Sequence, residues 1–184
     1  MKTKMNQDVV VLCEGAVMIA LAIVLSFIEL ELGVWGGSIG FAMIPIAIFA
    51  LRRGAVWGIG VGFVFGTLKF FIGDGTVANW VSLLLDYSVA YGAVGLAGLF
   101  CKMENKNVAA IAGTAVGCLS RYLVSFISGV TVYAEYAEPT FAGISTPNAF
   151  IYSIVYNGAY MIPSTIIALV VVPVIFLALK RFKV

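Results

Sequence analysis

Residues 149–179, AFIYSIVYNGAYMIPSTIIALVVVPVIFLAL, contain no Asp, Glu, Lys or Arg. A helix of about 20 apolar residues crosses the hydrocarbon core of a bilayer, so this stretch is long enough to span one. Its prolines, Pro163 and Pro173, are tolerated in a membrane bundle because neighbouring helices satisfy the freed backbone groups. The stretch therefore predicts a transmembrane helix, and the sequence before it is similarly apolar.

The composition of the whole chain is that of a membrane protein. Hydrophobic residues make up 62% of the 184, charged residues make up 11%, and the mean hydropathy is +1.07. Soluble domains are typically about a quarter charged. With about 20 residues per crossing plus short loops, the length suits about six spans, and no shift in composition marks a second domain. We predict an all-α integral membrane protein, a bundle of about six transmembrane helices in which residues 1–184 form one domain.

The spans are expected at residues 8–28, 39–51, 55–72, 81–100, 108–129 and 149–179. The second of these is short and carries Pro45, so it is expected to be kinked or to begin inside the preceding loop.

The charges between the spans predict the orientation. Basic residues cluster at the N-terminus, after the second span, after the fourth and after the sixth, which all lie on one side of such a bundle. The positive-inside rule makes this side cytoplasmic, with both termini. The opposite loops carry Glu29, Glu31, Asp74, Glu135 and Glu138 but no Lys or Arg. The clustered basic residues are Lys2, Lys4, Arg52, Arg53, Lys102, Lys106, Lys180, Arg181 and Lys183.

Two spans carry small residues four apart, which makes one helical face smooth. The third span has Gly54, Gly58, Gly62 and Gly66, and close packing inside the bundle is the expected reason. The first span has Ala16 and Ala20. This pair fits either packing inside the bundle or contact with a partner.

The residues present exclude several kinds of chemistry. There is no histidine, and Cys13, Cys101 and Cys118 are scattered, so neither a metal site nor a disulfide framework is expected. A small intramembrane enzyme is poorly supported, because no span holds paired carboxylates and no serine has a plausible base. A phosphate-binding loop is also missing. The basic clusters are not interleaved with aromatics, so no nucleic-acid partner is expected, and neither is a cofactor.

Ionisable residues inside spans are informative because each costs about 2.5–3.5 kcal/mol at a helix centre. Glu14 and Lys69 lie near span ends, where their side chains can reach the interface. Asp86 and Arg121 lie roughly 8 and 12 Å below the outer surface, at 1.5 Å per residue. These two fit either a structural ion pair or a ligand site.

Polar and aromatic residues around them favour a site. Arg121, Ser125 and Gly129 recur at every fourth position, so they share a helical face. The last span has two stripes of its own. One consists of Ser153, Asn157 and Tyr160, and the other of Tyr152, Tyr156 and Tyr160. A carboxylate, amide and hydroxyl groups and several aromatic rings suit a flat, cationic, heteroaromatic ligand, which the rings stack on and the carboxylate neutralises.

At these residues the chain resembles the thiamin-specific S-components (the ThiT family) of energy-coupling-factor (ECF) vitamin transporters. The resemblance runs through nearly the whole chain and is specific only when its motifs are taken together. The motifs are Gly-Gly-Ser at 36–38, Met-Ile-Pro at 43–45, Leu-Leu-Leu-Asp-Tyr at 83–87, Arg-Tyr at 121–122, Ile-Ser-Gly at 127–129, Ile-Tyr-Ser-Ile-Val-Tyr-Asn at 151–157 and Tyr-Met-Ile-Pro-Ser at 160–164.

The resemblance implies six helices, cytoplasmic termini and a vitamin pocket near the outer face. One departure is Ser125, which stands where the family usually has histidine. This removes an imidazole wall and leaves open an S-component for a thiamin precursor or another water-soluble vitamin. The residues that match the family pocket are Trp35, Asp86, Tyr87, Gly129, Tyr133, Tyr152 and Asn157.

The resemblance also implies how such a protein works. S-components bind the vitamin and hydrolyse nothing. They dock on an ECF module, a transmembrane coupling protein with two ATPase subunits, and the loaded subunit reorients in the bilayer. The family's docking surface includes small residues of the first helix, which match Ala16 and Ala20. The chain is therefore expected to be a multi-pass protein of the bacterial plasma membrane, with thiamin as its ligand and the module as its partner.

Overall fold

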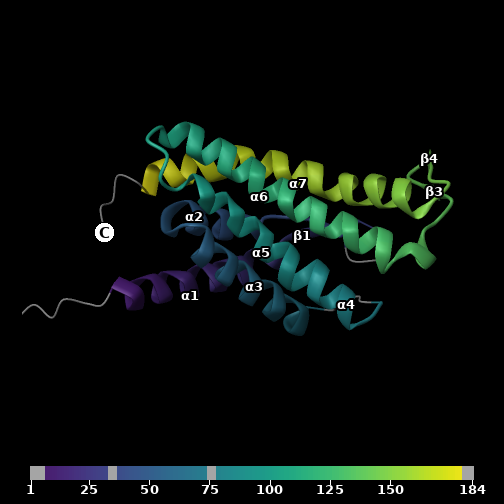
Figure 1. Ribbon diagram of the computed structural model, residues 1–184, viewed down its shortest axis with the longest axis horizontal. Coiled ribbons are helices and arrows are strands. Elements are labelled where there is room, and N and C mark those ends of the chain that lie inside the picture. The colour runs from purple at the N-terminus through teal and green to yellow at the C-terminus, as the bar shows by residue number, and fades with distance from the viewer. Residues whose placement is uncertain (1–6, 33–36, 74–77, 180–184) are drawn as a thin grey trace, which may run out of the picture.

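The computed structural model describes residues 7–32, 37–73 and 78–179. Within these ranges, five helical segments are long and apolar enough to cross a membrane. They run roughly parallel to one another and form an elongated bundle (Figure 1). The segments are α1 (Gln7–Ser26), α3 (Ala55–Ile72), the run Trp80–Phe100, α6 (Lys106–Thr131) and α7 (Ala149–Leu179). The predicted spans over these segments are confirmed to within two residues at each end.

The predicted second span differs from the structure at its beginning. The strand β1 (Glu29–Leu32) pairs antiparallel with the strand β2 (Gly37–Gly40), and the two strands are called the β1–β2 hairpin. The helix α2 (Met43–Arg53) begins only after it, with Pro45 in its first turn, where a missing N–H leaves no intrahelical bond unmade. At 1.5 Å per residue, α2 is about 16 Å long, roughly half the thickness of the hydrocarbon core.

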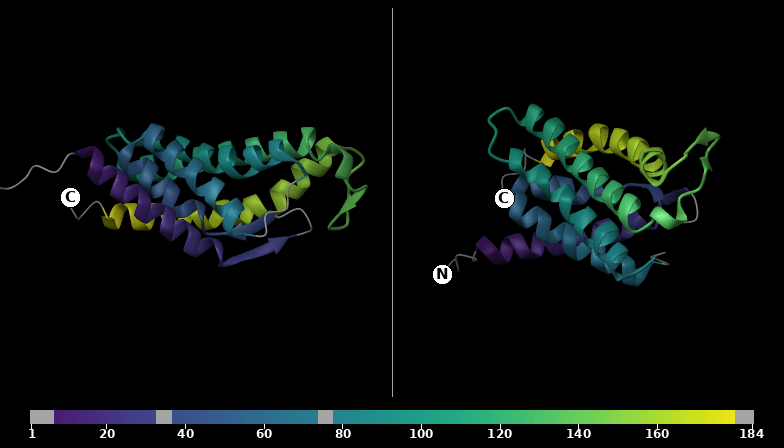
Figure 2. Two further views of the ribbon diagram at one scale, coloured as in Figure 1. Left: turned by 90° about the horizontal axis from the view of Figure 1, so that it is seen from below. Right: turned by 45° about the vertical axis from the view of Figure 1, so that its right-hand side comes forward.

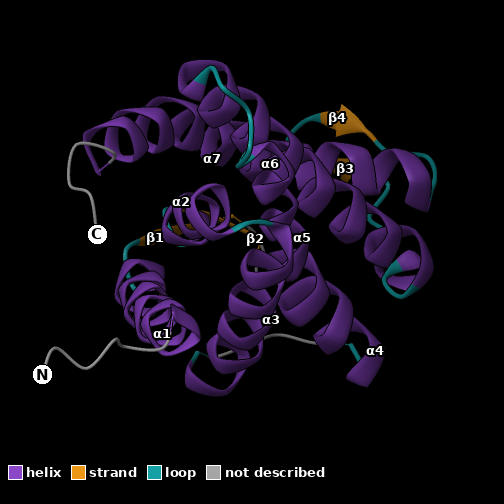
Figure 3. Ribbon diagram, turned by 60° about the vertical axis from the view of Figure 1, so that its left-hand side comes forward, coloured by secondary structure: helices purple, strands orange, loops and turns teal. Residues whose placement is uncertain are grey.

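Although α2 is short, it is the centre of the bundle. Every residue from Met43 to Leu51 is buried, and the helix lies among α1, α3 and α7 (Figure 3). A helix that is apolar all round is stable only when it is covered on all sides. Phe49, Ile46 and Leu51 are almost completely inaccessible and supply much of the apolar core.

The glycine stripe of α3 is a packing surface, as predicted. A Cβ at Gly62 or Gly66 would collide with the carbonyl oxygens of Tyr91 and Tyr87, and one at Gly58 would collide with Ala50. The backbone of α3 therefore touches the Trp80–Phe100 segment directly. Gly54 plays a different part, since it joins α2 to α3 with φ +96°, a conformation that favours glycine.

The segment Trp80–Phe100 is not a uniform α-helix. It consists of α4 (Trp80–Ser82), the π-helix η1 (Leu83–Val89), α5 (Ala90–Val94) and the 3₁₀-helix η2 (Gly95–Phe100). The N–H of Ala90 bonds to the carbonyl of Leu85, five residues earlier. Such π-helical turns are rare and often occur at functional sites. Asp86 lies within this one.

The two ends of the bundle differ. The start of α1, the turn from α2 to α3 and the end of α7 lie together at one end (Figure 1). Here Glu14 bonds to Arg52 at 2.6 Å and also to Arg53, which fastens α1 to that turn. The other end carries η3 (Ala134–Tyr136) and a small hairpin of β3 (Thr140–Phe141) and β4 (Ile144–Ser145), which extends beyond the helices (Figure 2).

The face of α1 that carries Ala16 and Ala20 points away from the bundle. Both alanines are exposed, whereas Val11 and Gly15 on the same helix are buried. Packing inside the protein's own bundle, one of the two interpretations of this pair, is therefore not the arrangement in the structure.

Candidate ligand-binding site

A cavity lies between the halves of α6 and α7 nearest the β3–β4 hairpin. It is closed on the other side by α3, η1 and α5. Its walls combine carboxylate, cationic, amide and hydroxyl groups with seven tyrosine rings. The lining residues are Lys69, Asp86, Tyr87, Tyr91, Arg121, Ser125, Gly129, Tyr133, Tyr136, Tyr152, Ser153, Tyr156, Asn157 and Tyr160.

Asp86 enters the cavity from the π-helix η1. Its Oδ2 accepts a 2.6 Å hydrogen bond from the hydroxyl of Ser128 on α6. Among the described residues, the ion pairs within 4 Å are Arg52–Glu14, Arg53–Glu14 and Lys69–Glu29, so Asp86 has no cationic partner there. The structural ion pair between Asp86 and Arg121, one of the two sequence-based interpretations, is not formed. The carboxylate thus keeps acceptor capacity for a ligand.

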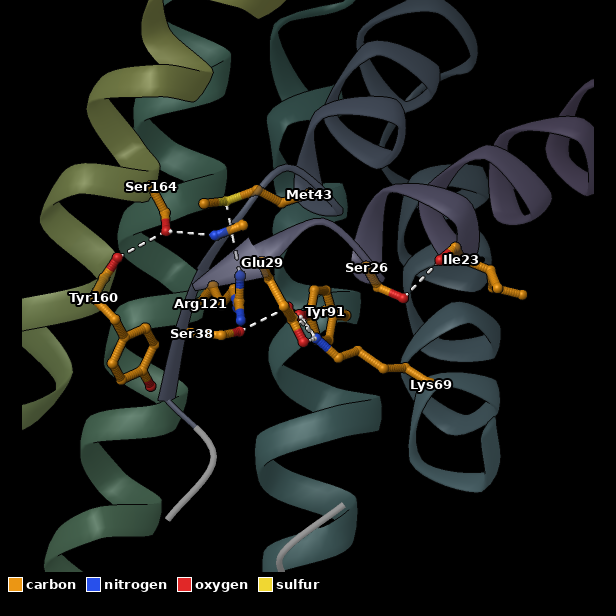
Figure 4. Close-up of polar contacts among 11 residues, drawn as sticks. Ile23, Ser26, Glu29, Ser38, Met43, Lys69, Tyr91, Arg121, Tyr160 and Ser164 are labelled. Atoms are coloured by element: carbon orange, nitrogen blue, oxygen red, sulfur yellow. Dashed lines mark hydrogen bonds and ion pairs between the residues drawn. The ribbon is translucent and has the colours of Figure 1, made fainter. Parts of the chain in front are cut away.

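Arg121 lies deeper, on α6, and is 9% exposed. Its guanidinium carbon is 4.1 Å from the ring centroid of Tyr91, a cation–π contact. Its Nη1 is 3.9 Å from the sulfur of Met43, and Figure 4 shows the side chain beside these two residues. Its Nε is buried and has no hydrogen-bond partner among residues 7–32, 37–73 and 78–179.

The α7 wall is a column of tyrosines. Tyr152 and Tyr156 are stacked, with ring centroids 5.7 Å apart and planes 11° apart, and Tyr160 meets Tyr156 edge-on. Phe141, from the β3–β4 hairpin, packs edge-on against both Tyr152 and Tyr156. Residues four apart share a helical face, so the predicted stripe is present. It presents flat aromatic surface to the cavity.

Asn157 is held in one orientation by its neighbours. Its Nδ2 donates to the backbone oxygen of Ser153 at 2.9 Å and contacts the Ser153 hydroxyl at 3.1 Å. Its Oδ1 accepts from the Tyr160 hydroxyl at 2.5 Å. Gly129 allows this approach of α6 to α7, because a Cβ there would collide with Ser153 and lie 3.4 Å from the Asn157 amide.

The β1–β2 hairpin is tied to the cavity from two sides. Glu29 of β1 accepts bonds from Lys69 at 2.7 and 2.9 Å and from the Ser38 hydroxyl at 2.7 Å (Figure 4). The N–H of Gly37 donates to the hydroxyl of Tyr156 at 3.1 Å. The position of Lys69 in the sequence predicted that its side chain reaches the interface. In the structure it forms an ion pair with the hairpin instead.

Most of the predicted binding residues meet at this cavity. Asp86, Tyr87, Arg121, Ser125, Gly129, Tyr133, Tyr152 and Asn157 all line it. Tyr133 lies just beyond α6, and burial raises the pKa of its phenol above the ordinary value. Trp35 lies outside the described residues, and Ala16 and Ala20 lie on the exposed face of α1.

Sequence reasoning missed Lys69, Tyr91 and Tyr136 as lining residues. The signal for Lys69 was its charge within an apolar span, and its partner Glu29 lies forty residues away. Tyr91 is five residues after Asp86, a spacing that separates two residues on an α-helix but brings them together across a π-helical turn. No group of three His, Cys, Asp or Glu that suits a metal ion occurs in the described ranges.

Comparison with known proteins identifies the family. The model of the family "Thiamine transporter protein (Thia_YuaJ)" matches residues 12–184. The chain is similar to thiamine transporter ThiT of Lacticaseibacillus paracasei, with 33% identity covering 92% of this chain and 88% of that protein. It is also similar to thiamine transporter ThiT of Bacillus subtilis, with 34% identity covering 96% of each.

A solved structure of ThiT from Listeria monocytogenes has the same fold. It superimposes with a TM-score of 0.81 at 26% sequence identity, covering 96% of this chain and 98% of that one. The relatives are named as transporters rather than enzymes. With several membrane-spanning helices and a family match over nearly its whole length, the chain belongs to the thiamine transporter family and is a multi-pass protein of the bacterial plasma membrane.

Proposed function

We propose that residues 1–184 form a single transmembrane substrate-binding domain that captures thiamin in the cavity between α6 and α7. Thiamin has two flat heteroaromatic rings joined by a methylene group, and its thiazolium ring carries a fixed positive charge. The observation that carries the proposal is Asp86, a carboxylate set among tyrosine rings that has a hydroxyl partner but, within the described ranges, no cationic partner. A ligand cation would supply the missing charge, and the rings would stack on both heterocycles.

Each of the remaining polar groups has a part in this proposal. Asn157 offers its amide to the aminopyrimidine ring, in an orientation already fixed by Ser153 and Tyr160. Tyr87 and Tyr133 line the same cavity near Asp86. A pocket of buried, oriented polar groups discriminates well, since a ligand that lacks the matching groups leaves them unpaired. Trp35 is proposed to complete the site from the first outer loop.

The proposed topology has about six crossings, the β1–β2 hairpin and α2 together making the second. Support comes from charge, because Arg52, Arg53, Lys102 and Lys106 flank the helix ends at the end of the bundle where α1 starts and α7 finishes (Figure 1). By the positive-inside rule this end faces the cytoplasm and the cavity faces outward.

Uptake is proposed to depend on an ECF module, a transmembrane coupling protein with two ATPase subunits. The loaded protein docks on it and reorients in the bilayer, and ATP is hydrolysed by the partners. The exposed pair Ala16 and Ala20 supports a docking face on α1, because small residues let a partner helix approach closely.

Calorimetry of the purified protein tests the ligand, with thiamin, its phosphates, its pyrimidine half, riboflavin and biotin titrated in parallel. Thiamin is expected to bind far more tightly than riboflavin or biotin. Preference for another vitamin would overturn the substrate assignment, and turnover of a substrate without partners would indicate an enzyme.

Docking is tested on the same purified protein with Ala16→Trp and Ala20→Trp. Both variants should bind thiamin normally yet fail to capture the module and fail to support uptake in cells. Leu21→Trp is the matched control, because Leu21 is also exposed on α1 but lies on another side of the helix. Joint loss of thiamin binding and module capture would instead mean that the alanine face supports the protein's own fold.

A further inference from the structure

Arg121 is the charged group of the cavity whose hydrogen-bonding capacity is least used. A guanidinium has five N–H donors in a planar fork and stays protonated in proteins. The contacts of this one are the Tyr91 ring at 4.1 Å and the Met43 sulfur at 3.9 Å. A thioether is a weak acceptor, and Nε has no hydrogen-bond partner in the part of the chain that the structure describes. Arg121 is largely buried but lines the cavity, so an acceptor bound in the cavity can reach its guanidinium.

The other charges around the cavity are already engaged. Glu29 receives Lys69 on both of its oxygens and the Ser38 hydroxyl on one. Asp86 receives the Ser128 hydroxyl and is not within ion-pair distance of Arg121. Lys69 and Glu29 neutralise each other, so the remaining charges of the cavity are those of Asp86 and Arg121. These two are opposite in sign but lie farther apart than the 4 Å of an ion pair.

Binding of a cation changes this balance. A cationic ligand that uses Asp86 as its counterion, as in the proposed function, neutralises the negative charge that most nearly offsets Arg121. A buried charge without a partner is strongly unfavourable. The ligand-loaded cavity therefore needs one further negative charge beside the guanidinium, and thiamin itself does not carry one.

We propose that Arg121 forms an anion subsite of this cavity, which takes a small inorganic monoanion such as chloride together with the cationic ligand. The guanidinium N–H groups that face the cavity supply the donors, and the Tyr91 ring holds the plane of the guanidinium in place. Ligand cation and anion then bind cooperatively, because each offsets the charge that the other leaves buried. The subsite deepens the proposed function and depends on it only in that the ligand is a cation.

The test compares thiamin affinity of the full chain in sodium chloride and in sodium gluconate, each at about 150 mM so that screening is equal. Gluconate is far bulkier than chloride, so it is not expected to bind beside the guanidinium. Binding is expected to be about tenfold or more tighter in chloride, the scale of one charge-assisted hydrogen bond. Equal affinity in the two salts overturns the subsite and leaves the proposed function standing, whereas no thiamin binding in either salt overturns the proposed function.

Variants assign the effect to Arg121. Arg121→Met should abolish the chloride dependence, and Arg121→Lys, which keeps the charge, should retain part of it. Arg52→Met is the matched control, because it removes an arginine at the opposite end of the bundle and should leave the dependence intact. If Arg121→Met fails to fold, bromide located beside Arg121 by anomalous diffraction from crystals of the thiamin-loaded wild type decides, and its absence there overturns the proposal.

Discussion

The hydroxyl of Ser128 on α6 donates a 2.6 Å hydrogen bond to the carboxylate of Asp86 on η1, across forty-two positions of sequence. Ser128 is fully buried, so this bond fixes the direction of the carboxylate without supplying a positive charge. Its neighbour Gly129 lets α7 approach closely at the same level. Ser128 and Gly129 are consecutive on α6. Ser128 positions the carboxylate of Asp86 on η1, and Gly129 lets α7 lie close beside the same cavity.

Asp86→Asn removes the charge and keeps the size, so it isolates the electrostatic part of ligand binding. A charge-assisted hydrogen bond contributes about 1.5–3 kcal/mol, which predicts a loss of about 10- to 150-fold in thiamin affinity. Calorimetry of the variant and the wild type measures this loss of affinity. Ser128→Ala should cost less, because it removes a neutral donor and leaves the carboxylate. An Asp86→Asn protein that binds thiamin like the wild type would show that the carboxylate is not the counterion.

Gly129→Ala should force α6 and α7 apart beside the site, because the new Cβ would collide with Ser153. Overpacking of this kind typically costs about 1–3 kcal/mol. Both thermal stability and thiamin affinity should fall. The double variant Gly129→Ala with Ser153→Gly should recover part of the loss, since it removes the colliding atoms. Losses that simply add would argue against contact between the two positions.

Gly62→Ala and Gly60→Ala form a matched pair on α3. A Cβ at Gly62 collides with the carbonyl of Tyr91, whereas nothing lies within 4 Å of one at Gly60. Gly62→Ala should therefore destabilise the bundle by about 1–3 kcal/mol. Gly60→Ala should stabilise it by up to about 1 kcal/mol through helix propensity. Unfolding in detergent measures both, and equal effects would contradict the packing of α3 on the Trp80–Phe100 segment.

Glu29→Gln should loosen the β1–β2 hairpin from α3, because it removes the partner of Lys69 at 2.7 Å. The loss of stability should be about 3 kcal/mol or less, because the pair is partly exposed and breaking a fully buried pair costs about 3–5 kcal/mol. Hydrogen exchange of backbone amides in residues 37–40 should become faster, while exchange in α6 stays unchanged. Ser38→Ala is the control, since it removes a neutral bond to the same carboxylate and should have a smaller effect.

Cysteine labelling tests the orientation in cells. After the native cysteines are replaced, single cysteines in the loops around Asp74 and Glu135 should react with an impermeant thiol reagent added outside. A cysteine at Lys102 should react only after permeabilisation. Labelling of Lys102→Cys from outside would contradict a cytoplasmic location for that loop and for both termini.

The amino-acid sequence alone determined the membrane environment, the extents of the long helices and most of the candidate site. Hydropathy is summed over the residues of one segment, so stretches such as 55–72 and 149–179 can be recognised as membrane spans without reference to the rest of the chain. The cost of burying an ionisable group is just as local, and it singled out Asp86 and Arg121 before any neighbour was known.

Only the tertiary structure decided which group each of these residues meets. Asp86 bonds to Ser128 and not to Arg121, and Lys69 pairs with Glu29, because the rotation of each helix is set by contacts such as Gly62 against Tyr91. The π-helix η1 lies in the same packed region, since a Cβ at Gly66 would collide with the carbonyl oxygen of Tyr87. The strand β2 (Gly37–Gly40) also could not be predicted from the sequence. It is held by β1 and by α7, and no local pattern in the chain specifies these partners.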